Sequence, residues 1–225
     1  MSRSVVSNHT PRCARCQLTP RWCICAGHRE IASPLGVTVL QHFMESYRPS
    51  STGHLIQRVV ASSSRVLYRR ERPVERGEIA PDHRETWVLH PQGDPMPANA
   101  RAADLRVVLI DGNWAQSSEM ARAASLHGRR INLPMTGESR YWLREQSGVG
   151  RFSTVEALIF LLGALGLAEA QAQLRLQFEL HVFASLCGRG QKQEAAAYLV
   201  DSPIRTAFAE LVENLTRNRR TSEEA

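Results

Sequence analysis

The segment LRVVLIDGNWAQS, residues 105–117, determines the fold predicted for this chain of 225 residues. Leu105 to Ile110 is apolar apart from Arg106, and such a run predicts a strand buried on both faces. Asp111 and Gly112 then allow a turn, and a helix is expected from about Asn113 to Leu126. A buried strand that leads directly into a helix is typical of a mostly parallel sheet with helices on both faces.

The segments on either side of residues 105–117 continue this α/β pattern. Short apolar or β-branched runs predict further strands at residues 35–40, 64–69, 86–90 and 129–133. A loop start and helical spacing predict a helix that contains Ile56, Val59 and Val60. Residues 91–101 are rich in Pro, Gly and Asn, which indicates a loop.

The last third of the chain is predicted to be helical. Ser153 or Thr154 is expected to cap a helix that reaches Leu167 and is apolar on nearly every side, hence buried all round. Residues 174–183 alternate as a strand would, but residues 168–186 lack Gly and Pro and favour a helix. Ser202 and Pro203 predict the start of a final helix that ends near Leu215.

The composition excludes several classes of protein. The chain is 43% hydrophobic and 22% charged, which is typical of globular proteins and not of disordered or fibrous ones. The longest apolar run, residues 155–167, is shorter than the roughly 20 residues of a membrane span. The N-terminus lacks the apolar core of a signal peptide. We therefore expect a cytoplasmic protein with no membrane partner.

The charge favours a polyanionic partner. Lys and Arg number 28 against 22 Asp and Glu, which gives a net charge of +6. The excess lies in the N-terminal two thirds, and a nucleic acid would be attracted to it. The alternative is that the abundance of arginine only reflects the codon usage of a GC-rich genome.

Four cysteines predict a metal site near the N-terminus. Cys13, Cys16, Cys23 and Cys25 have the spacing C-x2-C-x6-C-x-C. In a reducing compartment this cluster favours a metal over disulfides, and four thiolates suit tetrahedral Zn²⁺ in a closed, structural site. An iron–sulfur cluster and a set of metal-free thiols are the alternatives.

Two other residues bear on this N-terminal knuckle, which we expect to comprise residues 1–31. His28 follows the last of the four cysteines and could replace one of them as a ligand. Cys187 lies far away in an apolar segment and is expected to be a small buried hydrophobic residue.

Two polar segments are candidates for a site. Asp111 follows a buried strand, and parallel sheets bind ligands beyond the carboxyl ends of their strands. The second segment, residues 138–157, contains Arg144 and then a helix start at Ser153 and Thr154 that could bind an anion. The structural alternatives are that Asp111 only caps a helix, and that Ser153 and Glu156 form a capping box.

Together these motifs resemble the DTW-domain family. The resemblance includes the cysteine spacing, QHFMESYRPSSTGHL (residues 41–55), IDGNWAQSSEM (110–120), INLP (131–134) and YWLRE followed by FSTVEAL. Two positions depart from the family pattern. Asn113 stands where the family signature Asp-x-Thr-Trp has threonine, and Phe43 stands where proline usually follows the histidine.

The resemblance implies a fold and a reaction. Residues 32–217 would form the DTW catalytic domain with a SPOUT-like sheet, which can carry a deep C-terminal knot, and residues 218–225 would be a frayed tail. Family members transfer the 3-amino-3-carboxypropyl group of S-adenosylmethionine to N3 of a uridine in tRNA and release 5′-methylthioadenosine. Asp111 would accept the N3 proton.

The resemblance also implies a set of residues around the reacting groups. The backbone of Leu109, Ile110, Gly112 and Leu133 would hold the adenosine, and Trp114 would offer a flat surface. Ser153, Thr154, Glu156 and Arg144 would receive the amino-acid end of the donor. His42, Glu45, Thr52 and Asn113 would complete the site.

Two other functions remain open at this stage. A methyltransferase that modifies RNA would release S-adenosylhomocysteine in place of methylthioadenosine. A zinc-ribbon protein that only binds RNA would not bind S-adenosylmethionine. We expect a monomer that binds tRNA.

Overall fold

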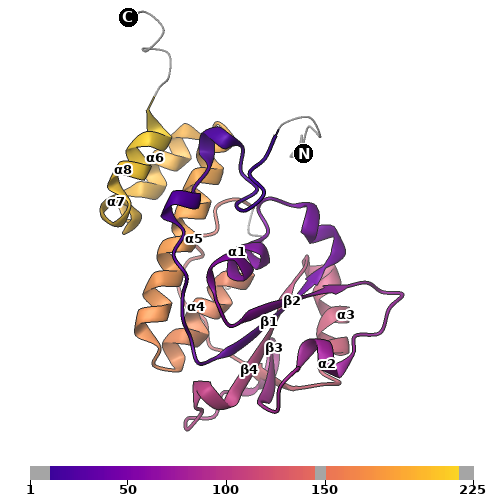
Figure 1. The fold of residues 1–225 in the computed structure, drawn as a ribbon. Coiled ribbons are helices and arrows are strands. Elements are labelled where there is room, and N and C mark those ends of the chain that lie inside the picture. The colour runs from indigo at the N-terminus through magenta and orange to yellow at the C-terminus, as the bar shows by residue number, and fades with distance from the viewer. Residues whose placement is uncertain (1–10, 145–150, 218–225) are drawn as a thin grey trace, which may run out of the picture.

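Five parallel strands form one sheet in the computed structural model, which describes residues 11–144 and 151–217 (Figure 1). The order across the sheet is β2-β1-β4-β3-β5, with β4 at the centre. The strands are β1 (Gly36–His42), β2 (Ser63–Tyr68), β3 (Glu85–Pro95), β4 (Leu105–Asp111) and β5 (Arg129–Asn132). The predicted parallel α/β sheet is therefore confirmed.

Eight α-helices and four short 3-10 helices accompany the sheet in the described part of the chain. The α-helices are α1 (Thr52–Val59), α2 (Arg76–Ile79), α3 (Trp114–Ala124), α4 (Thr154–Ala164), α5 (Ala168–Gly188), α6 (Lys192–Val200), α7 (Ile204–Ala207) and α8 (Ala209–Thr216). The 3-10 helices are η1 (Pro20–Trp22), η2 (Cys25–Gly27), η3 (Phe43–Tyr47) and η4 (Ala102–Asp104). None of the described helices has the length and apolar content that a membrane span requires.

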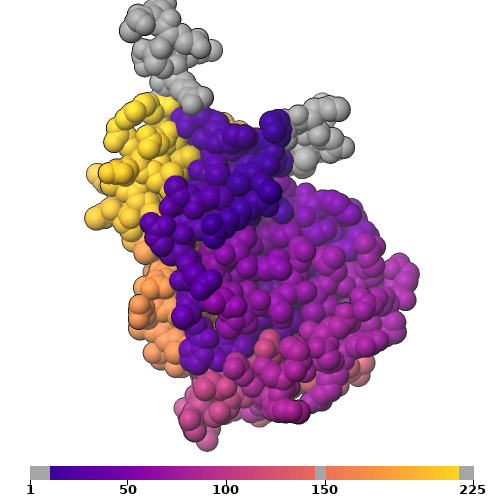
Figure 2. Space-filling model, viewed as in Figure 1, coloured from indigo at the N-terminus to yellow at the C-terminus, as the bar shows by residue number. Residues whose placement is uncertain are grey.

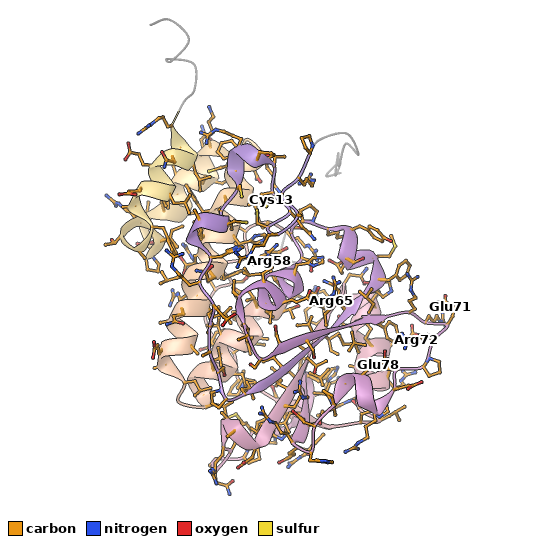
Figure 3. The ribbon with its side chains drawn as sticks, in the orientation of Figure 1. Cys13, Arg58, Arg65, Glu71, Arg72 and Glu78 are labelled. Carbon is orange, nitrogen blue, oxygen red and sulfur yellow. The ribbon has the colours of Figure 1, made fainter. Side chains whose placement is uncertain are left out.

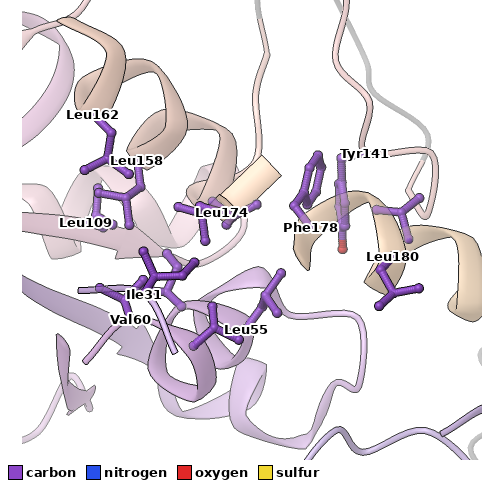
Figure 4. Close-up of a cluster of buried hydrophobic side chains, with 14 of the residues drawn as sticks. Ile31, Leu55, Val60, Leu109, Tyr141, Leu158, Leu162, Leu174, Phe178 and Leu180 are labelled. Atoms are coloured by element: carbon purple, nitrogen blue, oxygen red, sulfur yellow. The ribbon is translucent and has the colours of Figure 1, made fainter. Parts of the chain in front are cut away.

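The central strand supplies both hydrophobic cores because its side chains alternate between the faces of the sheet. Val107 and Leu109 belong to the larger core, with residues of α1, α4 and α5, part of which Figure 4 shows. Val108 belongs to the smaller core, with Met120 and Ala124 of α3. Helices on both faces thus explain why β4 is almost entirely apolar.

The order of the strands creates a switch point between β1 and β4. α1 leads from β1 to β2 on one side, and α3 leads from β4 to β5 on the other. Gln41 and Asp111 pair in register, so β1 and β4 end at the same level. Ligands bind at such points in open α/β sheets, beyond the carboxyl ends of the strands.

Two expectations about loops and helix lengths are corrected. β3 runs to Pro95, into the predicted loop, because Ile131 of β5 pairs with both Leu89 and Asp94 across an irregularity in β3. α4 ends at Ala164 and not at Leu167, because Gly166 adopts a left-handed conformation with φ 73°. The amide of Leu167 then donates to the carbonyl of Leu162 (2.8 Å), which closes the helix.

Two expectations about helix burial and continuity are also corrected. α4 is not buried all round, since Ile159 and Phe160 are only half-buried and Ala164 is exposed. The final helix is two helices, because Phe208 leaves the helical region (φ −133°, ψ 41°) between α7 and α8. Phe208 packs against the larger core, which accounts for the break. α5 is helical as expected, and α6 was not predicted.

The N-terminal segment packs on the C-terminal helices, although they are far apart in sequence (Figures 1 and 2). The Arg21 guanidinium donates to the carbonyls of Asn214 (2.8 Å) and Arg217 (2.7 Å). The Gln177 side-chain amide of α5 donates to the carbonyl of Gly27 (2.9 Å). The predicted tail, residues 218–225, and residues 145–150 of the second candidate segment lie outside the described residues.

Candidate active site at the end of the central strand

Asp111, the last residue of β4, is the centre of a buried polar cluster. Its side chain accepts hydrogen bonds at Oδ2 from Gln41 Nε2 (2.8 Å) and Ser51 Oγ (2.7 Å), and at Oδ1 from Thr154 Oγ1 (2.9 Å). A carboxylate offers about four acceptor positions, so the remaining position is on Oδ1. Since Thr154 belongs to the second candidate segment, the structure brings the two predicted clusters together.

Two helices begin at this carboxylate. Ser51 is the N-cap of α1, and Thr154 is the first residue of α4. Helix N-termini carry partial positive charge, which favours the negative charge of Asp111 although the residue is only 5% exposed. A Cβ atom on Gly53 would lie 2.5 Å from Asp111 Oδ2, so α1 can approach this closely only with glycine there.

Glu156 has its acceptors occupied within the protein. Its carboxylate accepts from the backbone amides of Ser153 and Arg140 (both 2.7 Å) and from the hydroxyls of Ser153 and Ser139. Ser153 and Glu156 form the capping box of α4, which confirms the structural interpretation. Glu156 therefore fixes the loop before α4, and a donor molecule would have to displace one of these contacts to reach it.

Arg144 is held by a buried acid. Its Nη2 lies 2.6 Å from Oε2 of Glu45, which is 1% exposed, and Arg48 Nη1 lies 2.7 Å from Glu45 Oε1. Burial alone would lower the pKa of Arg144, but the Tyr141 phenol and the Glu45 carboxylate reverse the effect, and the net shift is upward. Arg144 is thus a fixed cation, and among the described residues Glu45 is the only carboxylate that pairs with it.

Trp114 forms an exposed aromatic surface next to the cluster. Its side chain is 55% exposed at the start of α3. The Arg151 guanidinium carbon lies 4.6 Å from the centre of its ring, in cation–π geometry. A flat exposed ring three residues after the buried carboxylate suits a planar ligand that presents a polar edge.

The cysteine cluster fits a tetrahedral metal. The four Sγ atoms lie within 4.8 Å of one another, and the pairs Cys13–Cys25 and Cys16–Cys23 are 3.5 and 3.7 Å apart. Zn–S bonds of about 2.3 Å in a tetrahedron require sulfurs about 3.8 Å apart. Within the described residues His28 is not part of this group, so the four cysteines suffice. Cys187 is buried on α5, as expected.

The surroundings of the cysteines favour a thiolate at Cys13. Backbone hydrogen bonds from Cys16 and Arg15 lower the pKa of the Cys13 thiol to about 6, whereas burial raises the pKa of the Cys16 and Cys25 thiols. Arg58 lies close enough to the cysteines for their charge to affect its own pKa, and its buried Nε and Nη2 have no hydrogen-bond partner in the described structure. A tetrathiolate centre carries net negative charge and would provide that partner.

The DTW domain family matches residues 10–187, well over half of the chain. The chain belongs to the DTW-domain family. It is 29% identical over 187 residues to tRNA-uridine aminocarboxypropyltransferase 2 of Drosophila melanogaster. The aligned region covers 75% of this chain and 70% of the Drosophila protein. No solved structure matches significantly.

In this DTW-domain protein Asn113 occupies the threonine position of the signature and caps α3. The Gln116 amide donates to Asn113 Oδ1 (2.9 Å), and the Asn113 amide donates to Gln116 Oε1 (2.9 Å). This reciprocal pair caps α3. Asparagine and threonine are both good N-cap residues, so the substitution preserves the start of the helix after Gly112.

The other residues predicted to belong to the site lie around the cluster without contacting Asp111 through a described hydrogen bond. His42 ends β1, and its Nδ1 accepts from the Met44 amide (3.3 Å). Thr52 is buried at the start of α1. Leu109 and Leu133 are buried in the larger core and Ile110 is half-buried, so only their backbones could face a ligand.

Two partners of Asp111 are not evident from the sequence. Gln41 and Ser51 both donate to its carboxylate. Arg65 Nη1 of β2 in turn lies 3.4 Å from Gln41 Oε1. Gln41 is a polar residue directly after the apolar run 35–40, and this position could have marked it as a site residue. Only the adjacency of β1 and β4 shows that its side chain binds Asp111.

Proposed function

We propose that this DTW-domain protein transfers the 3-amino-3-carboxypropyl group of S-adenosylmethionine to N3 of a uridine in tRNA. The observation that carries the proposal is the buried Asp111 carboxylate at the junction of β1, β4, α1 and α4, within the family's signature motif. The family membership and the name of the Drosophila relative support it.

The proposed reaction is a displacement at carbon. Uridine N3 loses its proton to Asp111 Oδ1, which has an acceptor position left. The N3 lone pair then forms a bond to the methylene carbon attached to the sulfonium. The carbon–sulfur bond breaks, and the sulfur keeps its electron pair in 5′-methylthioadenosine. A site that presents this carbon, and not the methyl group, in line with N3 would account for the choice between them.

The remaining site residues would position the two substrates. The backbone of residues 109–112 and Leu133 would hold the adenosine, and Arg144 would pair with the donor's carboxylate while Glu45 keeps it in place. Trp114 would stack on a planar base. The SPOUT-like kinship of the sheet and a C-terminal knot are part of this proposal.

The N-terminal knuckle would support RNA binding and not the chemistry. A Zn²⁺ ion held by four cysteines has no open coordination position and supplies a rigid, closed structural centre. The knuckle lies beside the last turn of α1 through the Arg58 hydrogen bond to the carbonyl of Arg15 (3.2 Å). Basic residues there would bind tRNA phosphates, which makes binding steeply dependent on salt.

Product analysis tests the proposed reaction. The purified protein is incubated with S-adenosylmethionine and unmodified tRNA, and the sulfur products and tRNA nucleosides are separated by chromatography with mass detection. We expect 5′-methylthioadenosine and a uridine heavier by one aminocarboxypropyl group. S-adenosylhomocysteine and methylated RNA would show a methyltransferase, and no binding of S-adenosylmethionine would leave only an RNA-binding protein.

A further inference from the structure

A polar cavity lies between the knuckle and the sheet, apart from the Asp111 cluster. Its volume is about 440 Å³. Arg15 and Gln17 line it from the knuckle, Gln57 and Arg58 from α1, and Arg65 from β2. Figure 3 shows Arg58 between Cys13 and Arg65. None of the described lining residues is acidic.

The cations of this cavity are not neutralised by the protein's own acids. Among the described residues, Arg15, Arg58 and Arg65 form no ion pair with a carboxylate, whereas Arg106 and Arg144 do. Burial lowers the pKa of Arg58 to about 10, so it stays protonated at neutral pH. Arg58 lies against the cysteines, which leaves Arg15 and Arg65, both exposed, to receive an anion.

His54 adds a neutral wall to the cavity. Burial and the nearby Arg65 cation lower its pKa, so the ring is uncharged at neutral pH. Its Nε2 lies 3.2 Å from the carbonyl of Ser46. The cavity therefore combines two exposed guanidinium groups with neutral donors, a set that matches the oxygens of a phosphate.

The cavity is coupled to the reaction centre by one side chain. Arg65 Nη1 lies 3.4 Å from Gln41 Oε1, and Gln41 Nε2 donates to Asp111 Oδ2 (2.8 Å). An anion on Arg65 is thus separated from the reacting carboxylate only by Gln41. The volume is also in the range of small-molecule sites, about 300–1,000 Å³, and exceeds what a bare phosphate needs.

We propose that this cavity binds a backbone phosphodiester of the substrate RNA, close to the nucleotide whose base reaches Asp111. The proposal rests on the proposed function for the identity of the partner. It assigns Arg15 and Arg65 as positioning residues, which hold the RNA in register with Asp111 and take no part in the transfer.

The test compares the salt dependence of tRNA binding in matched variants. Arg15→Gln/Arg65→Gln should weaken binding of an unmodified tRNA transcript about fivefold or more, and should reduce the slope of log affinity against log salt by about 1. Arg65→Lys keeps the charge and should keep most of the slope. Arg101→Gln, next to η4 at the amino end of β4, is the control and should keep the slope and affinity of the wild type.

Affinity for S-adenosylmethionine and thermal melting are measured on the same preparations and should stay at the wild-type values. The proposal is overturned if the double variant keeps the wild-type slope, or if affinity for tRNA and the donor fall together with the melting temperature. Inorganic phosphate at constant ionic strength should compete with tRNA more strongly in the wild type than in the double variant; equal competition would also contradict the site. The salt dependence of tRNA binding can be measured even if the protein releases no methylthioadenosine. Failure of the proposed function is therefore distinguishable from failure of the proposed phosphate site.

Discussion

Gly53 is the residue that allows α1 to lie against the Asp111 carboxylate. We predict that Gly53→Ala lowers the free energy of unfolding by about 2 kcal/mol, because the added methyl would meet Oδ2 at 2.5 Å and Val39 at 3.0 Å. Turnover should also fall, since the Asp111 carboxylate must move to make room for the methyl group. Denaturant unfolding measures the stability, and the rate of methylthioadenosine release measures the turnover.

Gly77→Ala is the matched control for this substitution. Gly77 lies in α2, and an added Cβ there would meet nothing within 4 Å. Alanine should be neutral or should stabilise the protein by up to about 1 kcal/mol. Equal stability of the two variants would contradict the close packing of α1 on Asp111.

At the residue scale, the sequence predicts individual members of the polar cluster better than it predicts their contacts. Asp111 and Thr154 were both predicted, because an acid after a buried strand and a hydroxyl at a helix start are local signals. Gln41 and Ser51 were missed, since their use depends on which strand lies beside β4. Glu156 was assigned to the donor as well as to a cap, and only its hydrogen-bond partners show how fully the cap occupies it.

The cysteine knuckle is the element with the sharpest prediction. Purified protein should contain about one zinc, and Cys23→Ser should lose it, whereas Cys187→Ser should not. Removal of the metal should weaken tRNA binding more than binding of S-adenosylmethionine, because the site is closed and lies in the N-terminal segment. Metal analysis that finds undiminished zinc in a variant in which all four cysteines are replaced would refute the assignment.

At the element scale, most strands and helices could be predicted, and their ends could not. β4 and α5 follow from local patterns, because apolar runs and helix-forming residues act within the segment. The break at Phe208 depends on packing against the larger core, and the extension of β3 depends on pairing with β5. Both are interactions with distant residues, which a local pattern does not contain.

At the scale of the whole molecule, a buried histidine makes stability depend on pH. His181 of α5 is fully buried, and neither ring nitrogen has a hydrogen-bond partner in the described structure. Burial, followed by the charges of Arg58 and His28, lowers its pKa well below 6.5. Below pH 6.5 the unfolded chain therefore binds a proton that the folded protein does not, and stability is lost as the pH falls.

We predict that stability decreases from pH 7 to 5.5 by about 1 kcal/mol more in the wild type than in His181→Gln. The glutamine variant cannot take up that proton, so its pH dependence should be shallower even if it is less stable at both values. His83→Gln, at an exposed position, serves as the control. Parallel pH curves for wild type and His181→Gln would exclude this source of acid instability.

The order of the strands was the part of the whole fold that the sequence did not reveal. The alternation of strands and helices predicts a parallel sheet, but not that β1 and β4, about 70 residues apart, are neighbours. That adjacency places Gln41 beside Asp111 and creates the switch point. The knot that a SPOUT-like sheet can carry stays a prediction.

The most direct test of the account is the rate of methylthioadenosine release by Asp111→Asn under saturating tRNA and donor. Since Asn has one acceptor oxygen and cannot take the N3 proton, we expect turnover per folded molecule to fall by about 100-fold or more. Three donors face this side chain, two of them buried, so a loss of about 1–3 kcal/mol of stability is expected as well. Asp104→Asn, in η4 at the other end of β4, should retain wild-type turnover. An Asp111→Asn protein that is destabilised but fully active per folded molecule would contradict the central claim and make this carboxylate a structural one.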